Sequence, residues 1–330
     1  MLNGKSILIT GGTGSFGKKF AETVLRDYPE IERIVIFSRD EYKQFVMSNM
    51  PEFKDSNKLR YFIGDVRDKE RLLRAFDGID IVVHAAALKQ VPACEYNPFE
   101  AVKTNVMGAQ NIIDAAIDKN VKRVIALSTD KACSPINLYG ATKLCSDKLF
   151  IAGNVYVGSK DTRFSVVRYG NVAGSRGSVI PFFKNLLENG AKELPITDMR
   201  MTRFWLKLEQ AVEMVILGLE TMEGGELYVK KIPSMKMTEL AKAMASNLPF
   251  KEVGIRPGEK IHEMMISSED ARNTIEFDKY FIIYPDLEGI KLSDFNNGKP
   301  VSDNFEYHSG NNPEWLSVED MKKLIREIGN

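Results

Sequence analysis

Short apolar runs and longer amphipathic segments alternate through the first half of this 330-residue chain. Because the runs are apolar almost without interruption, they are typical of strands that are covered on both faces. The expected strands cover residues 6–10, 33–37, 59–64, 79–85, 123–128 and 164–168. Between them, apolar residues recur at helical spacing, as Phe16, Phe20 and Val24 do. This alternation predicts an α/β fold with a Rossmann-type, doubly wound parallel sheet.

The pattern changes after about residue 170, where turn-rich pieces separate the helical segments. We therefore expect a sheet domain over residues 1–170, to which some later segments return. Residues 171–330 are expected to form a smaller substrate-binding lobe and a C-terminal tail, with a cleft between the two parts. Within the tail, residues 291–313 are rich in Asn, Ser and Gly, a composition that favours a loose surface segment.

Composition excludes several classes of protein. The 45 Lys and Arg balance the 45 Asp and Glu, whereas a nucleic-acid or membrane-surface partner would require a basic excess. Three cysteines predict no disulfide framework, and three scattered histidines predict no metal site. The first strand begins too early to leave room for a signal peptide, and the longest apolar run is too short to span a bilayer. We expect a soluble, cytoplasmic protein.

A glycine-rich loop, Thr10–Gly17, joins the first expected strand to the first expected helix. Its glycines permit a tight turn, let backbone N–H groups approach a pyrophosphate, and let the helix lie close to the sheet. Since the required strand and helix flank the loop, it indicates a dinucleotide site and not an ordinary turn. The expected contacts are Gly11, Thr13, Gly14, Ser15, Phe16 and Gly17.

The end of the second strand bears on the choice of dinucleotide. An acidic residue there would bind the ribose 2′-hydroxyl group of NAD, but this chain has Ser38 followed by Arg39. These residues suit the 2′-phosphate of NADP, and Lys43 adds charge one helical turn later. The sequence favours NADP, with NAD as the alternative because Asp40 lies nearby. Asp65, at the end of the third strand, either meets the adenine amino group or caps the next helix.

Tyr139 and Lys143 are four residues apart on an expected helix and therefore share one face of it. A phenol with a pKa of about 10 is no base at neutral pH, but a neighbouring ammonium group and a positive nicotinamide would favour the phenolate. The hydroxyl pair Ser128 and Thr129 ends the strand before this helix. With the glycine loop, these residues resemble the short-chain dehydrogenase/reductase pattern, in which the tyrosine removes a hydroxyl proton while a hydride leaves the same carbon.

Most of the chain resembles the extended branch of that superfamily, and in particular the inverting UDP-N-acetylglucosamine 4,6-dehydratases of pseudaminic acid biosynthesis. The matching segments are residues 10–17, 38–40, 84–89, 127–143, 168–178, 195–205, 231–238 and 254–263. Residues 305–316 also resemble the end of these enzymes, which speaks against a loose tail. One departure is Gln90, where many members carry His. The resemblance implies tightly bound NADP that is recycled in each turnover, UDP-N-acetylglucosamine as substrate, and a homo-oligomer, often a hexamer.

The pair Asp130-Lys131 distinguishes this dehydration from simpler reactions of the superfamily. Oxidation of the sugar at C4 makes the C5 proton acidic, and loss of water then needs a base at C5 and an acid for the C6 hydroxyl group. An Asp kept protonated and a Lys kept neutral by burial could divide these tasks. We assign Lys131 as the C5 base and Asp130 as the acid, with a hydride returned to C6. Tyr139 or water would reprotonate C5 on the opposite face. Without the flanking motifs, Asp130-Lys131 would indicate only an ion pair on the protein surface.

The resemblance also implies the remaining contacts. Further cofactor contacts are expected at Val66, Ala85, Val172 and Arg176. Substrate contacts are expected at Lys89, Lys131, Asn171, Arg256 and Glu259, with Thr197 and Arg203 as weaker candidates. Arg256 can neutralise a diphosphate, and Glu259 can accept hydrogen bonds from ribose hydroxyl groups.

The predicted product is UDP-2-acetamido-2,6-dideoxy-β-L-arabino-hex-4-ulose. The nearest alternatives are a UDP-sugar 4-epimerase and a retaining 4,6-dehydratase. A non-catalytic protein that senses dinucleotides is a third alternative. Such proteins usually lose the Tyr or the Lys of the catalytic pair, and both are present here.

Overall fold

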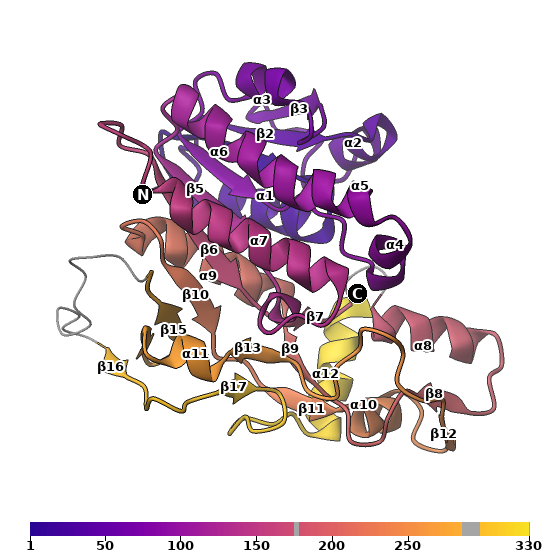
Figure 1. The fold of residues 1–330 in the computed structure, drawn as a ribbon. Coiled ribbons are helices and arrows are strands. Elements are labelled where there is room, and N and C mark those ends of the chain that lie inside the picture. The colour runs from indigo at the N-terminus through magenta and orange to yellow at the C-terminus, as the bar shows by residue number, and fades with distance from the viewer. Residues whose placement is uncertain (175–177, 286–297, 330) are drawn as a thin grey trace.

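The structure, a computed structural model, describes residues 1–174, 178–285 and 298–329 (Figure 1). The largest element in these ranges is a ten-stranded sheet, in which the seven neighbouring strands from β10 to β3 are parallel. Across the sheet, the strands are β16 (Lys299–Pro300), β14 (Thr274–Glu276), β15 (Tyr280–Ile283), β10 (Leu227–Lys230), β6 (Arg163–Arg168), β5 (Arg123–Leu127), β4 (Ile81–His84), β1 (Ser6–Thr10), β2 (Arg33–Ser38) and β3 (Leu59–Ile63). The α/β fold class expected from the sequence is confirmed.

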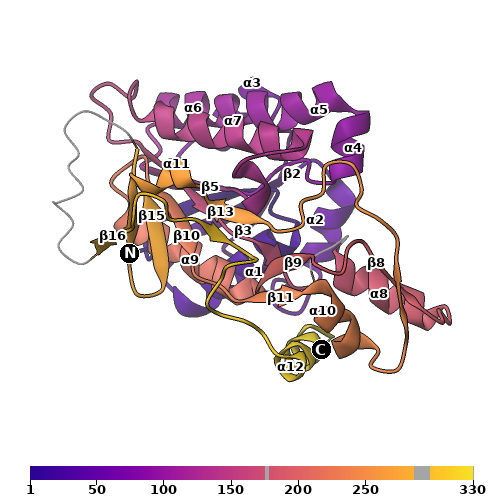
Figure 2. The ribbon, with the colours of Figure 1, turned by 60° about the horizontal axis from the view of Figure 1, so that its bottom comes forward.

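Helices cover both faces of the sheet (Figure 2). On one face, α6 (Gly108–Asp118) lies between α3 (Lys69–Ala75) and α7 (Leu138–Gly153). On the other face, α1 (Ser15–Asp27) packs against α9 (Leu208–Thr221). The shorter helical elements are α2 (Glu41–Ser48), α4 (Val91–Tyr96), α5 (Pro98–Val102), the π-helical turn η1 (Lys103–Met107), the 3₁₀ turn η2 (Asp130–Ala132) and α11 (Ser268–Ala271).

The continuous apolar runs form strands because both of their faces are covered. Ile7, Leu8 and Ile9 of β1 are all fully buried, although successive side chains point to opposite faces. Burial of each such side chain stabilises the folded protein by about 1.5–3 kcal/mol. Exposure of either face of this strand to water would therefore be unfavourable. All six expected strands are present, with ends that differ by two residues at most.

Strands from the second half of the chain extend the same sheet. β10 pairs in parallel with β6, and β15 then pairs antiparallel with β10. β14 and β16 continue the antiparallel edge. The domain boundary at residue 170 stays a prediction, but these four strands show how closely later segments join the sheet.

The smaller lobe consists of short strands and three helices. β11 (Ser234–Lys236), β9 (Thr202–Leu206) and β7 (Asn171–Val172) form one sheet, and β12 (Phe250–Glu252) pairs with β8 (Leu194–Ile196). The helices are α8 (Val179–Glu188), α10 (Met237–Met244) and α12 (Val318–Gly329). A separate apolar cluster, which includes the fully buried Trp205, holds them together.

The expectation of a loose tail over residues 291–313 is wrong for residues 298–313, while residues 291–297 lie outside the described part of the chain. β17 (Tyr307–His308) pairs with β13 (Met264–Ile266). The buried Tyr307 hydroxyl group donates to the carbonyl oxygen of Ile232 and accepts from its N–H group. Asn312 and Ser309 are also buried, so side-chain hydrogen bonds fix a segment whose composition indicates a loop.

Within the described ranges, no helix combines the length and the apolar composition needed to cross a membrane.

Gly17→Ala is expected to lower the free energy of unfolding by about 1–3 kcal/mol, because a Cβ atom at residue 17 would lie 2.4 Å from the Gly12 carbonyl oxygen. Urea unfolding measures this loss, and the control is Ser15→Ala, which changes an exposed residue on the first turn of the same helix. An unchanged unfolding midpoint for Gly17→Ala would show that α1 does not pack as closely as described.

Candidate active site

A cleft of about 1130 Å³ follows the carboxyl ends of the parallel strands and continues into the smaller lobe. Parallel α/β sheets bind their ligands at this edge. Nearly all the predicted site residues line it, from the glycine loop to the segment 256–259. Asp130 is buried behind the cleft wall, and Arg176 lies outside the described residues.

The glycine loop fits a dinucleotide. Gly11 has a φ of +66°, and a Cβ atom there would lie 3.0 Å from the backbone of Ala85 and Ala86. Gly14 precedes the first residue of α1 and has no side chain to cap it. The N–H groups of the first helical turn are therefore left to bind a pyrophosphate.

Two basic residues line the cleft just after the end of β2. Arg39 and Lys43 both line the cleft and are about half exposed. Ser38 is the last residue of β2, and its hydroxyl group accepts a hydrogen bond from the Gln44 side-chain amide. Asp40 caps α2 by accepting from the N–H group of Lys43 and pairs with the Lys43 amino group, so its carboxylate already has partners.

Asp65 is not a helix cap. The cap of α3 is Asp68, which accepts from the N–H group of Arg71. The Asp65 carboxylate instead accepts from Arg67 at 2.7 Å and faces Arg39 at 3.8 Å. Of the two interpretations made from the sequence, the cap is wrong, and the adenine contact stays a prediction for a residue that lines the cleft.

Tyr139 and Lys143 lie on α7, and both line the cleft as their spacing predicts. In the ligand-free protein, burial raises the pKa of Tyr139 to about 12, against the opposing effects of Lys131 and Thr129. Burial lowers the pKa of Lys143, while Asp147 opposes this. The lowered phenol pKa expected from Lys143 is therefore absent from the protein alone.

The two hydroxyl groups that follow β5 bind different partners. The Ser128 hydroxyl group donates to the buried Asp147 carboxylate at 2.6 Å. The Thr129 hydroxyl group donates to Asp130 Oδ1 at 3.0 Å and accepts from the N–H group of Lys131. Thr129 is thus linked directly to Asp130 and Lys131, while Ser128, which also lines the cleft, is hydrogen-bonded to Asp147 of α7.

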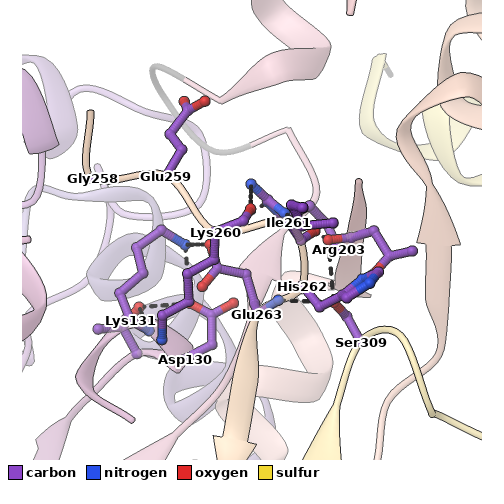
Figure 3. Close-up of polar contacts among 12 residues, drawn as sticks. Asp130, Lys131, Arg203, Gly258, Glu259, Lys260, Ile261, His262, Glu263 and Ser309 are labelled. Carbon is purple, nitrogen blue, oxygen red and sulfur yellow. Dashed lines mark hydrogen bonds and ion pairs between the residues drawn. The ribbon is translucent and has the colours of Figure 1, made fainter. Parts of the chain in front are cut away.

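Lys131 lies between two buried carboxylates (Figure 3). Its Nζ atom is 3.1 Å from Asp130 Oδ1 and 3.1 Å from Glu263 Oε1. Glu263 comes from the smaller lobe and also faces Arg203 Nε at 3.7 Å. Glu259 points away from this cluster. Two lobes therefore supply the charges around one amino group.

These contacts decide the charge on Lys131. Burial alone would lower the pKa of Lys131, but the Asp130 and Glu263 carboxylates raise it above its usual value. Burial raises the pKa of Asp130, although Lys131 opposes this. The expectation of a protonated acid agrees in direction with the Asp130 environment. The expectation that burial keeps the lysine neutral is wrong, because the two carboxylates outweigh the effect of burial on its pKa.

The expected substrate residues surround the same cleft. The segment 256–259 reaches it through a turn at Gly258, whose carbonyl oxygen accepts from the Asn137 amide at the start of α7. The Arg256 guanidinium group faces Glu259 at 3.8 Å and is largely exposed. Burial in the cleft and the nearby Lys131 charge lower the pKa of Lys89. Lys89, Asn171 and Thr197 line the cleft as well.

The sequence interpretation missed Glu263. Glu263 ends the segment 254–263 that resembles the dehydratases, but it lies 132 residues after Lys131 and no spacing relates the two. A buried carboxylate cannot be distinguished from a surface one in the sequence of a short loop. Within the described ranges, no group of three His, Cys, Asp or Glu residues is placed to hold a metal ion.

Residues 7–285 match the family described as polysaccharide biosynthesis protein. The chain belongs to that family. It is 57% identical over 332 residues to the inverting UDP-N-acetylglucosamine 4,6-dehydratase of Campylobacter jejuni, with 98% of each chain covered. It is also 41% identical over 328 residues to the UDP-glucose 4-epimerase of Rickettsia akari, covering 97% of this chain and 95% of that one. The resemblance inferred from the motifs is confirmed.

Solved structures share the fold of this family member. Pen from Bacillus thuringiensis superimposes with a TM-score of 0.90 and 38% identity, covering 99% of this chain and 98% of that chain. The dTDP-glucose 4,6-dehydratase DesIV from Streptomyces venezuelae, solved with NAD bound, has a TM-score of 0.70 and 25% identity. That match covers 78% of this chain and 86% of DesIV. DesIV therefore shows that a protein of this fold can hold NAD.

Proposed function

We propose that the chain is an inverting UDP-N-acetylglucosamine 4,6-dehydratase, a hydro-lyase that forms the UDP-linked 4-keto-6-deoxy sugar with inverted C5. The full-length identity of 57% to an enzyme of that name is the observation that supports it most strongly. The site agrees with this chemistry, because Lys131 lines the cleft together with Tyr139 and Lys143. A 4-epimerase needs only the tyrosine and the lysine of α7.

The residues of α7 serve the oxidation. A bound nicotinamide dinucleotide would supply the redox chemistry by accepting a hydride from C4 and returning it to C6, while Tyr139 or water would return a proton to C5. Tyr139 takes the proton of the C4 hydroxyl group. Because burial raises the pKa of Tyr139 to about 12, this role requires that the bound ligands lower it. Lys143, buried on the same helix face, lies where an ammonium group favours the phenolate.

The pair Asp130 and Lys131 serves the elimination. The Lys131 ammonium group must lose its proton before it can take the proton from C5. Asp130 Oδ1, 3.1 Å away, can accept that proton, and burial raises the pKa of its carboxyl group. One transfer then gives a neutral amine as base and a protonated carboxyl group as acid, and a dry site favours the loss of both charges. Asp130 is buried and accepts a hydrogen bond from the hydroxyl group of Thr129, a residue that lines the cleft and would pass the proton to the departing C6 hydroxyl group.

The remaining cleft residues are proposed to bind the nucleotide-sugar. Arg256 would neutralise the diphosphate, and Glu259 would accept from the ribose hydroxyl groups. Lys89, Asn171 and Thr197 would contact the sugar and its phosphate. As the resemblance implies, the protein would assemble as a homo-oligomer, often a hexamer in these enzymes, and we expect it in the cytoplasm.

NADP is the proposed cofactor. Arg39 and Lys43 offer two cations to a 2′-phosphate, and the position that would hold an acidic residue in an NAD site is Ser38. Asp40 is engaged with α2 and Lys43, which leaves it poorly placed to bind a ribose hydroxyl group.

Arg39→Ala is expected to weaken NADP binding about tenfold and to change NAD binding little, because only NADP carries the 2′-phosphate. Titration of each dinucleotide, followed by quenching of protein fluorescence, measures both affinities. Arg60→Ala is the matched control, because Arg60 is exposed on β3 and does not line the cleft. Equal losses for the two dinucleotides, or no loss for NADP, would contradict the assignment of NADP.

Incubation with UDP-N-acetylglucosamine in D₂O is expected to place deuterium at C5 of an L-configured 4-ketosugar that has lost its C6 oxygen, as observed by NMR. Lys131→Met should slow this conversion about 10²- to 10⁴-fold, as expected for loss of a general base. The control is Lys148→Met, which changes an exposed lysine on α7. Formation of a C4 epimer with its C6 hydroxyl group intact would support the epimerase alternative raised by the Rickettsia akari relative.

A further inference from the structure

Glu263 is a buried carboxylate at the junction of the two lobes. It precedes β13, is 2% exposed, and lines the cleft. Its Oε1 atom faces Lys131 Nζ at 3.1 Å and Arg203 Nε at 3.7 Å. Its Oε2 atom is buried and has no hydrogen-bond partner within the described residues.

The backbone of Glu263 is held from the C-terminal tail. Its carbonyl oxygen accepts from the Ser309 N–H group at 2.7 Å, and its N–H group donates to Ser309 Oγ at 3.0 Å. The Ser309 hydroxyl group is in turn 2.7 Å from Thr202 Oγ1 of β9. The Arg203 guanidinium group adds hydrogen bonds to the carbonyl oxygens of Lys260 and Ile261. The backbone that carries this carboxylate is therefore held on both sides by side chains of the smaller lobe and the tail.

We propose that Glu263 is a positioning residue for the dehydration, because its fixed carboxylate shares the Lys131 amino group with Asp130 and holds that group in the cleft. The inference rests on the proposed function, in which Lys131 is the C5 base. Without Glu263, the flexible lysine side chain would have only Asp130, behind the cleft wall, as an ionic partner within the described residues. Glu263 thus keeps the amine where the sugar must lie.

A role in folding alone does not account for this arrangement. Burial of a carboxylate is unfavourable unless its oxygens are satisfied, and one Glu263 oxygen has no partner. Glu226 is different, because both oxygens of this buried carboxylate accept hydrogen bonds, from Ser165 and from backbone N–H groups. Glu226 therefore provides a matched control for the chemistry of Glu263.

The charge of Glu263 also affects the proton balance of the cluster. At low pH, both Asp130 and Lys131 carry protons, which is one proton too many for the elimination. The negative charge of Glu263 favours the state in which Asp130 and Lys131 are both protonated. Without that charge, the pair should lose one of its two protons at a lower pH. The charged and titratable groups that face Lys131 are Asp130 from η2, Glu263 and Lys260 from the segment before β13, Lys89 after β4, Arg203 from β9 and Tyr139 from α7.

Glu263→Gln tests the proposal, since it keeps the shape of the side chain and removes its charge. We expect kcat to fall about 10- to 100-fold, as for a displaced catalytic group, with KM changed less than about threefold. The acid limb of the kcat profile should move about one pH unit to lower pH. Glu263→Asp keeps the charge on a shorter side chain, and should lower kcat while leaving the acid limb near its wild-type position. Glu226→Gln should change neither quantity.

The proposal is overturned if Glu263→Gln retains the wild-type kcat and acid limb while Lys131→Met abolishes dehydration. That result would leave the proposed function intact. Full activity of Lys131→Met would instead remove the proposed role of the lysine, and this inference with it. Thermal melting checks that each variant is folded. Should Glu263→Gln fail to fold, Ser309→Ala loosens the same carboxylate, and a wild-type kcat for that variant would equally overturn the proposal.

Discussion

The ammonium group of Lys131 between two buried carboxylates is the interaction on which the rest of the site depends. Asp130 comes from η2, which follows β5, and Glu263 comes from the smaller lobe. Removal of one partner from such a buried pair typically costs about 3–5 kcal/mol, because the other charge is left unsatisfied. The same contact therefore links the two lobes and holds the Lys131 amino group beside the cleft.

The parallel sheet explains why the other groups meet there. Every strand from β10 to β3 delivers its carboxyl end to one edge, so the glycine loop, the end of β5 and Asn171 after β6 all border one cleft. α7 adds the Tyr139 and Lys143 pair on the face that covers this edge. Along the cleft, the wall is completed by the sheet domain near the glycine loop and by the smaller lobe near residues 195–203 and 256–263.

Much of this arrangement could be predicted from local sequence patterns. The parts that depend on contacts between distant residues could not. The continuous apolar strands, the loop Thr10–Gly17 and the spacing of Tyr139 and Lys143 each depend on neighbouring residues, and the structure contains them as expected. The anchored tail depends on hydrogen bonds such as those of Tyr307, which its polar composition does not reveal. The charge on Lys131 depends on Glu263, which approaches only through the fold. Burial alone therefore gave the wrong direction for the lysine pKa.

The titration of Lys131 itself tests this account most directly. In the ligand-free protein labelled with ¹⁵N-lysine, NMR can follow the Nζ signal of Lys131, assigned by its loss in Lys131→Arg. The two carboxylates predict an ammonium group whose pKa lies above the usual value of about 10.4. A Lys131 amine that loses its proton near neutral pH would contradict the account, because burial would then outweigh both ionic partners.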